Sequence, residues 1–252
     1  VYNDLSTVVG SNLNSTLTTS DTVGSETLTM TGTGSVGSQN YSGSSQSITL
    51  GTLTLGNGTN GGLATNYSLS GSTLTINKRP LNIDGSKTYD GNTNAANSLL
   101  TLSNLATDSS TGNAETLGLA GTATISSKNA GSRTITNAAS ALTLSNGSNG
   151  GLANNYTFTG GTHNFTINTR PLTVSGTRQY DGTTVASSTD LSTLSNFVGS
   201  ETVTLSGNGS VNSANVAINY SVNTSGLSIV NGSNGGLATN YNLTGGSYTL
   251  DI

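Results

Sequence analysis

The stretch Asn146–Tyr156 reads Asn-Gly-Ser-Asn-Gly-Gly-Leu-Ala-Asn-Asn-Tyr, and nearly the same eleven residues recur at Asn57–Tyr67 and Asn231–Tyr241. A match of this length is not chance, so it marks three copies of one unit. A glutamate followed by threonine recurs in the same order, at Glu26, Glu115 and Glu201. The repeating unit therefore has the size of one small domain.

Two further motifs indicate where each repeat begins. Tyr-Asp-Gly occurs twice, as Tyr89, Asp90 and Gly91 and as Tyr180, Asp181 and Gly182, and each copy follows an Arg-Pro-Leu that contains Pro80 or Pro171. Proline cannot donate to a β-ladder and holds the preceding residue extended, so these prolines mark the first strand of each unit. We predict repeat 1 at residues 1–78, repeat 2 at 79–169 and repeat 3 at 170–252. Repeat 1 lacks the opening strand, which we interpret as an excised or processed fragment.

Apolar and polar residues alternate within each repeat, which is typical of half-buried strands. Examples are Leu81 and Ile83 after the proline, and Phe165 and Ile167 at the end of repeat 2. We count at least five strands per repeat and predict an all-β protein of tandem antiparallel, immunoglobulin-like sandwiches arranged as an elongated rod. Spacings of three and four before the glutamate predict one short helix or 3-10 segment. A β-grasp-like repeat, in which this segment packs across a mixed sheet, is the alternative.

Charge is sparse along the whole chain. Only 7% of the 252 residues are charged, and the formal net charge is −4. Because no basic stripe is present to neutralise phosphates, we expect no nucleic-acid binding. No apolar run approaches the roughly 18 residues that cross a bilayer, so we expect no membrane insertion. The absence of cysteine removes disulfides and thiolate chemistry.

The Tyr-Asp-Gly motif is better explained by structure than by chemistry. Asp-Gly is a turn dipeptide in which glycine supplies a positive φ, while the tyrosine before it packs its ring and ties down its hydroxyl. Catalysis would need a recurring partner for the aspartate, and no His, Lys or Arg recurs beside the glutamate. His163 has no counterpart in the other repeats. We therefore expect no enzyme, no catalytic residues and no cofactor.

The glycine-rich stretch resembles a phosphate loop only in composition, because it leads into an alternating strand and carries no lysine. We interpret it as a tight connection that its tyrosines (Tyr67, Tyr156 and Tyr241) and leucines (Leu63, Leu152 and Leu237) pin to the core. Recognition of sugar hydroxyls by its asparagines is the minority interpretation. Calcium needs six to eight oxygen ligands, and one Asp and one Glu per repeat are too few, so we expect no metal site.

Taken together, Arg-Pro-Leu, Tyr-Asp-Gly-x-Thr, Gly-x-Glu-Thr, Lys-Asn-Ala-Gly at residues 128–131 and Asn-Tyr before a Gly-Gly hairpin resemble the YDG-type repeat of large bacterial surface adhesins, including filamentous-haemagglutinin-like secreted proteins. The resemblance covers residues 79–252 and most of 1–78, where Tyr2-Asn3-Asp4 departs from the triplet. It implies an exported, extended β-repeat stalk at the bacterial cell surface, with no enzymatic activity.

Three functions follow as expectations. The favoured one is a spacer that contributes to adhesion or biofilm formation by projecting a binding region, with neighbouring repeats of the same chain as its main partners. The second is a subunit of an extracellular fibre in which copies of the chain exchange strands, because the incomplete first sheet could accept a strand. The third is a carbohydrate-binding module for host or matrix glycans.

Overall fold

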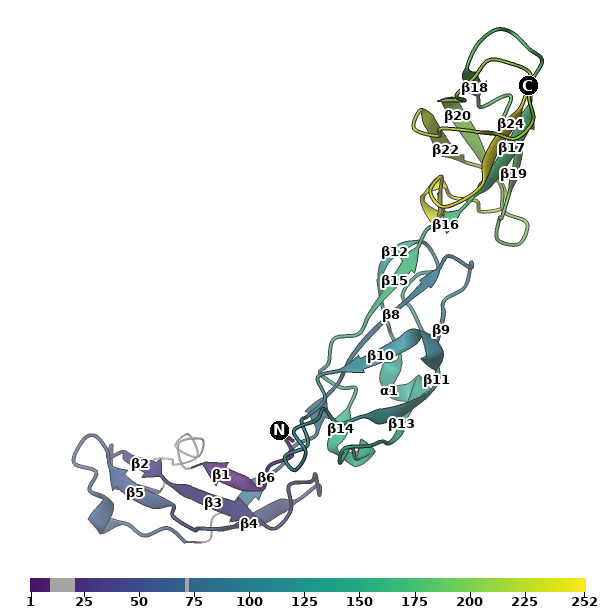
Figure 1. Cartoon of the computed structure of the whole chain (residues 1–252). Coiled ribbons are helices and arrows are strands. Elements are labelled where there is room, and N and C mark those ends of the chain that lie inside the picture. The colour runs from purple at the N-terminus through teal and green to yellow at the C-terminus, as the bar shows by residue number, and fades with distance from the viewer. Residues whose placement is uncertain (10–20, 71–72) are drawn as a thin grey trace. The chain divides into compact units, whose positions relative to one another are not determined.

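The computed structural model describes residues 1–9, 21–70 and 73–252. It is predominantly β-structure with 7% helix, which confirms the all-β expectation (Figure 1). The described chain forms two compact units. The N-terminal unit comprises Val1–Asn82, Leu102–Ala120 and Thr143–Thr162, and the C-terminal unit comprises Ile83–Thr101, Gly121–Leu142 and His163–Ile252. The boundary between them passes through repeat 2, so each unit contains one complete junction between successive repeats.

Repeat 1 lies in the N-terminal unit. Its elements are β1 (Thr7–Val9), β2 (Leu28–Thr31), β3 (Thr33–Val36), β4 (Ser45–Thr49), β5 (Thr54–Asn57), the 3-10 helix η2 (Ala64–Asn66) and β6 (Thr73–Thr75). One sheet has the order β1-β3-β4-β6, and β2 pairs with β5 in a second sheet. All registered pairs of these strands are antiparallel.

Repeat 2 contributes elements to both units. They are β7 (Arg79–Pro80), β8 (Asn82–Thr88), β9 (Asn94–Ala96), η3 (Asn97–Leu99), β10 (Leu100–Ser103), β11 (Leu117–Thr124), β12 (Gly131–Thr134), α1 (Ala138–Ala141), β13 (Leu142–Asn146), η4 (Ala153–Asn155), β14 (Tyr156–Thr157) and β15 (Asn164–Asn168). The sheet orders are β10-β8-β15-β12, β13-β11-β9 and β14-β7.

Repeat 3 lies in the C-terminal unit. Its elements are β16 (Arg170–Pro171), β17 (Thr173–Thr177), β18 (Val185–Ser187), β19 (Thr193–Ser195), β20 (Val203–Ser210), β21 (Tyr220–Ser221), β22 (Leu227–Asn231), η5 (Ala238–Asn240), β23 (Tyr241–Asn242) and β24 (Tyr248–Asp251). The sheet orders are β19-β17-β24-β21, β18-β20-β22 and β16-β23.

The four-stranded sheets of repeats 2 and 3 are mixed, which the favoured antiparallel sandwich does not include and the β-grasp alternative does. The opening strand of a repeat pairs in parallel with its closing strand, β8 with β15 and β17 with β24, as Figure 1 shows for β17 and β24. The short proline strands β7 and β16 also pair in parallel, with β14 and β23. A parallel pair needs a long connection, and here that connection is the rest of the repeat.

Two local expectations have different outcomes. The spacing before the glutamate gives the 3-10 turn η3 in repeat 2, one of the two forms expected, whereas the equivalent part of repeat 3 contains the strand β19. The prediction that the leucines pin the glycine-rich stretch to the core is wrong for Leu63 and Leu152, which are 48% and 36% exposed, while Leu237 is half-buried. Each leucine directly precedes a 3-10 turn.

Glycine is required in the glycine-rich stretch because the backbone just before β11 or β20 passes very close to it. A Cβ on Gly151 would lie 2.0 Å from the Thr116 carbonyl oxygen, and a Cβ on Gly236 would lie 1.9 Å from that of Thr202. The stretch therefore packs its backbone directly on the residue that follows each recurring glutamate. This contact places the tyrosine at the end of the stretch next to the same glutamate.

The cores are built from the alternating residues that the sequence identified. In the C-terminal unit, Ile83, Phe165 and Leu172 are at most 1% exposed. The N-terminal unit buries Leu81 completely, and its buried polar side chains include Tyr2 and Glu115, both at 0% exposure. Because a buried carboxylate is costly unless hydrogen bonds satisfy it, Glu115 identifies a site that needs explanation.

Candidate functional site at the repeat junctions

Each compact unit contains one place where two successive repeats meet, and a glutamate lies at its centre. In the N-terminal unit the Tyr2 hydroxyl of repeat 1 lies 2.5 Å from Glu115 Oε1 of repeat 2. The Tyr156 hydroxyl donates to Glu115 Oε2 at 2.7 Å. The two tyrosine rings meet edge to face, with centroids 5.5 Å apart. We call this arrangement the Tyr–Glu–Tyr triad.

The same triad recurs in the C-terminal unit between repeats 2 and 3. Tyr89 and Tyr241 each donate a hydroxyl proton to Glu201, at 2.7 Å in both cases. Their rings are 5.6 Å apart at 80°. Tyr89 is completely buried, and Glu201 and Tyr241 are 7% and 4% exposed. Two junctions separated by a whole repeat thus have one chemistry, in which two neutral donors satisfy both oxygens of one carboxylate.

Backbone groups complete the triads. The Tyr156 hydroxyl accepts the Ala106 N–H at 2.9 Å, and the Tyr241 hydroxyl accepts the Val198 N–H at 3.1 Å. Burial raises the pKa of Tyr2, Tyr89 and Tyr156 well above the ordinary value, and the hydrogen bond to the glutamate raises it further. Burial also raises the pKa of Tyr241, to about 12. At neutral pH the four tyrosines are therefore protonated donors.

The Tyr-Asp-Gly triplets form the turns that carry the first tyrosine of the triad. Asp90 Oδ1 accepts the Asn92 N–H, and Asp181 Oδ1 accepts the Thr183 N–H. Gly91 and Gly182 have φ of 78° and 74°, which a residue with a side chain rarely adopts. A Cβ on Gly91 would lie 2.7 Å from Val198 Cγ1 of the next repeat, so this glycine also serves the junction.

Two further parts of the triad, the Glu26–Tyr67 pair and Tyr180, form no complete triad among the described residues. Tyr67 donates to Glu26 Oε2 at 2.6 Å and accepts the Val23 N–H, as the closing tyrosines do elsewhere. Both Glu26 and Tyr67 are only half-buried. Tyr180, the equivalent of Tyr2 and Tyr89, is 61% exposed. Of the predicted tyrosines, the structure thus brings Tyr89, Tyr156 and Tyr241 into complete triads and leaves Tyr67 and Tyr180 in incomplete ones.

The prolines lie beside the triads. Pro80 and Pro171 are the second residues of β7 and β16, which pair in parallel with the strands that begin at Tyr156 and Tyr241. The arginine before each proline reaches back to the preceding repeat. Arg79 donates to the Tyr2 carbonyl oxygen at 3.3 Å, and Arg170 donates to the Tyr89 carbonyl oxygen at 3.4 Å.

Sequence reasoning missed a buried asparagine at each junction. Asn155 accepts the Tyr41 N–H at 2.9 Å and donates to Asn40, and Asn240 accepts the Ala130 N–H at 2.8 Å and donates to Asn129. Asn155 and Asn240 are completely buried. A signal was present, because an asparagine precedes the closing tyrosine in every copy of the glycine-rich stretch.

A shared cation was also missed. Lys87 and Arg178 stand two residues before the tyrosine of each triplet, and they form ion pairs with Asp90 and Asp181 at 2.9 and 3.1 Å. The two side chains are only 6% and 5% exposed. Because lysine in one repeat is arginine in the other, a search for identical residues did not align them. Their positive charge is the recurring feature.

Each triad joins two successive repeats through buried hydrogen bonds. Both oxygens of Glu115 and Glu201 are occupied by tyrosine hydroxyls inside a dry contact, and the tyrosines come from two different repeats. Among the described residues, no group of three or more His, Cys, Asp or Glu could hold a metal ion. No helix within the same residues is long and apolar enough to cross a membrane.

Comparison with known families finds two copies of one domain in the chain. The profile of the YDG domain matches residues 77–163 and again residues 166–249, which is more than half of the chain. No curated protein and no solved structure matches the chain. The two matched segments contain the two complete Tyr-Asp-Gly turns and both triad glutamates. This chain belongs to the YDG domain family.

Proposed function

We propose that the chain is a non-catalytic spacer segment of a bacterial cell-surface or secreted adhesin, in which tandem immunoglobulin-like repeats form a rod that projects a binding region. The observation that carries this proposal is the buried Tyr–Glu–Tyr triad, which recurs at both junctions with the same donors and acceptor. A spacer must resist bending where domains meet, and a dry, hydrogen-bonded contact restricts such motion.

The surface composition supports the same role. Only 7% of residues are charged, and the exposed positions of the strands are largely Thr, Ser and Asn. Such a coat is hydrated yet provides little electrostatic attraction for passing molecules. A spacer benefits from this property because it separates a binding region from the cell without competing for ligands.

The proposal is tested by single-particle electron microscopy of the purified chain and of the double variant Glu115→Ala/Glu201→Ala. We expect three collinear densities with a narrow distribution of angles in the native chain and a broad distribution in the variant. Glu26→Ala, which alters the incomplete triad, is the matched control and should keep the narrow distribution. Native particles that bend as freely as the double variant would overturn the rod. Antibody labelling of intact source cells tests the location, and labelling only after permeabilisation would overturn it.

A second candidate, the subunit of an extracellular fibre, is favoured by the incomplete triads. Glu26 and Tyr67 form the receiving half, and Tyr180 is the donating half, so one copy of the chain offers what another can bind. A heterologous contact of this type forms open polymers. Light scattering at rising concentration should show end-to-end growth that Tyr180→Ala abolishes, whereas a monomer at every concentration would exclude this candidate. The carbohydrate-binding interpretation stays a prediction.

A further inference from the structure

Each glycine-rich stretch contains two Asn-Gly bonds, and the structure holds them in different ways. The first asparagine of the two is Asn57, Asn146 or Asn231, and the second is Asn60, Asn149 or Asn234. The side-chain amide of an asparagine can be attacked by the backbone nitrogen of the next residue. A following glycine leaves this approach open because it has no Cβ.

The first bond is held at both reacting groups. In repeat 3 the Gly232 N–H, which would supply the nucleophile, donates to the Gly236 carbonyl oxygen at 3.0 Å. The side-chain oxygen of Asn231 accepts the Ala238 N–H at 2.8 Å. The same hydrogen bonds recur in the other repeats, from Gly58 to Gly62, from Gly147 to Gly151, from Ala64 to Asn57 and from Ala153 to Asn146. Attack at this bond would have to break both contacts.

The second bond lies at the centre of a type I′ turn. Asn234 and Gly235 both have positive φ, of 56° and 86°. The Gly236 N–H donates to the Ser233 carbonyl oxygen at 3.0 Å and closes the turn. Within the described part of the chain, the Gly235 N–H donates to no protein group. The nucleophile of the second bond is therefore open to water.

The three type I′ turns differ in the charge beside them. In repeat 1 a Cβ on the turn glycine would lie 3.7 Å from Glu26 Oε1, and in repeat 2 it would lie 4.0 Å from Asp108 Cγ. On Gly235 in repeat 3 it would meet no atom within 4 Å. A neighbouring carboxylate disfavours the amide anion that attacks, because like charges repel. Asn234 is also exposed, whereas Asn149 is half-buried, so Asn234 is the most reactive of the six.

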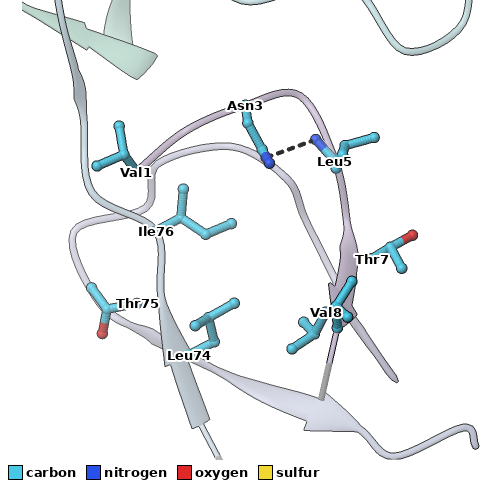
Figure 2. A pocket seen from close by; sticks show the side chains of 9 residues that line it. Val1, Asn3, Leu5, Thr7, Val8, Leu74, Thr75 and Ile76 are labelled. Atoms are coloured by element: carbon cyan, nitrogen blue, oxygen red, sulfur yellow. Dashed lines mark hydrogen bonds between the residues drawn. The ribbon is translucent and has the colours of Figure 1, made fainter. Parts of the chain in front are cut away.

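Asn3 of repeat 1 has the opposite properties and serves as an internal control. Its side-chain oxygen accepts the Leu5 N–H at 3.2 Å, the dashed line in Figure 2. The residue that follows it is Asp4, so the nitrogen that would attack belongs to a residue with a side chain and a carboxylate. Both features oppose the reaction that the Asn234 turn permits.

We propose that Asn234 is a site of spontaneous deamidation, where water converts the exposed asparagine into aspartate or isoaspartate. During a brief opening of the turn, the Gly235 nitrogen loses its proton to solvent and attacks Asn234 Cγ. The new C–N bond closes a succinimide ring, the Cγ–Nδ2 bond breaks, and Nδ2 leaves as ammonia after taking a proton from water. A water molecule then opens the ring at either carbonyl, and the product carboxyl group is ionised at neutral pH. Water is the only co-reactant, and the proposal does not depend on the spacer role.

The product alters the contact beside the triad of repeats 2 and 3. Asn234 Nδ2 donates to the Ser200 carbonyl oxygen at 2.9 Å, and Ser200 directly precedes Glu201. An ionised carboxylate has no proton to donate, so the hydrogen bond is replaced by repulsion between two oxygen atoms. The backbone that positions Glu201 thereby loses one of its supports. Deamidation thus weakens this junction as the protein ages.

Peptide mapping by mass spectrometry tests the site on the full chain, incubated at mildly alkaline pH in water labelled with heavy oxygen. We expect Asn234 to convert about tenfold faster than Asn231, because Gly232 must first give up its hydrogen bond. Asn3 should remain intact. In urea, where the fold no longer distinguishes the two Asn-Gly bonds, Asn231 and Asn234 should convert at similar rates. Equal rates in the folded chain, no conversion at Asn234, or the same preference in urea would overturn the proposal.

Urea denaturation of variants tests the consequence for the junction. Asn234→Asp should lower the urea midpoint, whereas Asn231→Asp, which keeps an acceptor for the Ala238 N–H, should leave it nearly unchanged. Native chain aged until Asn234 has converted should reach the midpoint of Asn234→Asp. Asn234→Gly accepts the positive φ and has no amide to lose, so its midpoint should not change on ageing. A native midpoint that stays constant while Asn234 converts would refute the effect on the junction.

Discussion

Tyr89 and Glu201 are 112 residues apart in sequence, yet the Tyr89 hydroxyl donates to Glu201 Oε1 at 2.7 Å inside a buried contact. Glu201 is thereby shared between its own repeat, through Tyr241, and the repeat before it, through Tyr89. The glutamate is satisfied completely only when the preceding repeat is docked. This dependence explains why its equivalent Glu26, with one tyrosine partner, remains half-buried.

Replacement of the central carboxylate should destabilise a complete junction. In Glu201→Gln, one of the two charged acceptor sites becomes an NH₂ donor, and the Tyr89 or Tyr241 hydroxyl loses a charge-assisted hydrogen bond. We expect the free energy of unfolding, measured by urea denaturation, to fall by about 1.5–3 kcal/mol. Glu26→Gln is the matched control, and its effect should stay below about 1 kcal/mol because the site is half-exposed. Equal losses at the two positions would contradict a role for the triad in docking.

Replacement of the turn glycine by alanine distinguishes two energetic costs: the strain of alanine at positive φ, and the steric clash of its Cβ with the next repeat. Gly91→Ala and Gly182→Ala both place alanine at positive φ, which costs about 1–2 kcal/mol. Only at Gly91 does the new Cβ meet the next repeat, 2.7 Å from Val198 Cγ1, while at Gly182 the nearest atom is 3.9 Å away. Thermal unfolding should therefore show a larger loss for Gly91→Ala. Addition of Val198→Ala should remove the excess, and failure of that rescue would count against the contact.

The buried asparagine gives a third comparison. Asn240→Ala leaves the Ala130 N–H without its acceptor in a closed contact, and an unsatisfied buried donor costs about 1–3 kcal/mol. Asn66 occupies the same place in repeat 1, where it is exposed, so Asn66→Ala should change stability by less than about 0.5 kcal/mol. Chemical denaturation of both variants checks the difference. A loss of similar size in both would assign the asparagine to its own loop instead of the junction.

Much of the fold could be predicted from the sequence because it depends on local patterns. Alternation gave the strands, and Pro80 and Pro171 marked where each opening strand begins. Alternation does not encode strand direction, so the favoured antiparallel interpretation missed the parallel pairing of β8 with β15, which only the β-grasp alternative with its mixed sheet allows. The leucine prediction was wrong because Leu63 and Leu152 precede a 3-10 turn that leaves them partly exposed, while the tyrosine at the end of that turn makes the buried contact.

The triad itself could not be predicted in the same way. Its members come from two repeats. The repeat boundaries that the prolines predict place Tyr89 and Glu201 in separate domains. The lack of a recurring basic partner beside the glutamate argues against catalysis, but it does not reveal that the partners of this glutamate are the recurring tyrosines. Lys87 and Arg178 were overlooked because their charge, and not their identity, is repeated. These relations become visible only when the repeats are packed against each other.

Alkaline pH should separate the repeats by ionising the triad tyrosines. The folded pKa of Tyr241 is about 12, above the ordinary tyrosine value of about 10 that applies in the unfolded chain. The folded state therefore holds its proton longer, so the stabilisation is complete below pH 10, declines as the pH rises from 10 to about 12, and is lost above that range. Each such tyrosine contributes a slope of up to about 1.4 kcal/mol per pH unit, and the pKa of Tyr2, Tyr89 and Tyr156 is raised in the same direction.

Phenolate absorbance and circular dichroism, recorded together during an alkaline titration, check this prediction. Ionisation of the buried tyrosines should coincide with the loss of β-structure, because the phenolate cannot remain beside the Glu201 or Glu115 carboxylate in a dry contact. Tyr241→Phe should lower stability at neutral pH and make its decline with pH shallower. Tyr180→Phe, at a ring that is 61% exposed, controls for the removal of one chromophore. Full ionisation of all nine tyrosines with the dichroism spectrum intact would show that the hydroxyls of the triads are open to solvent.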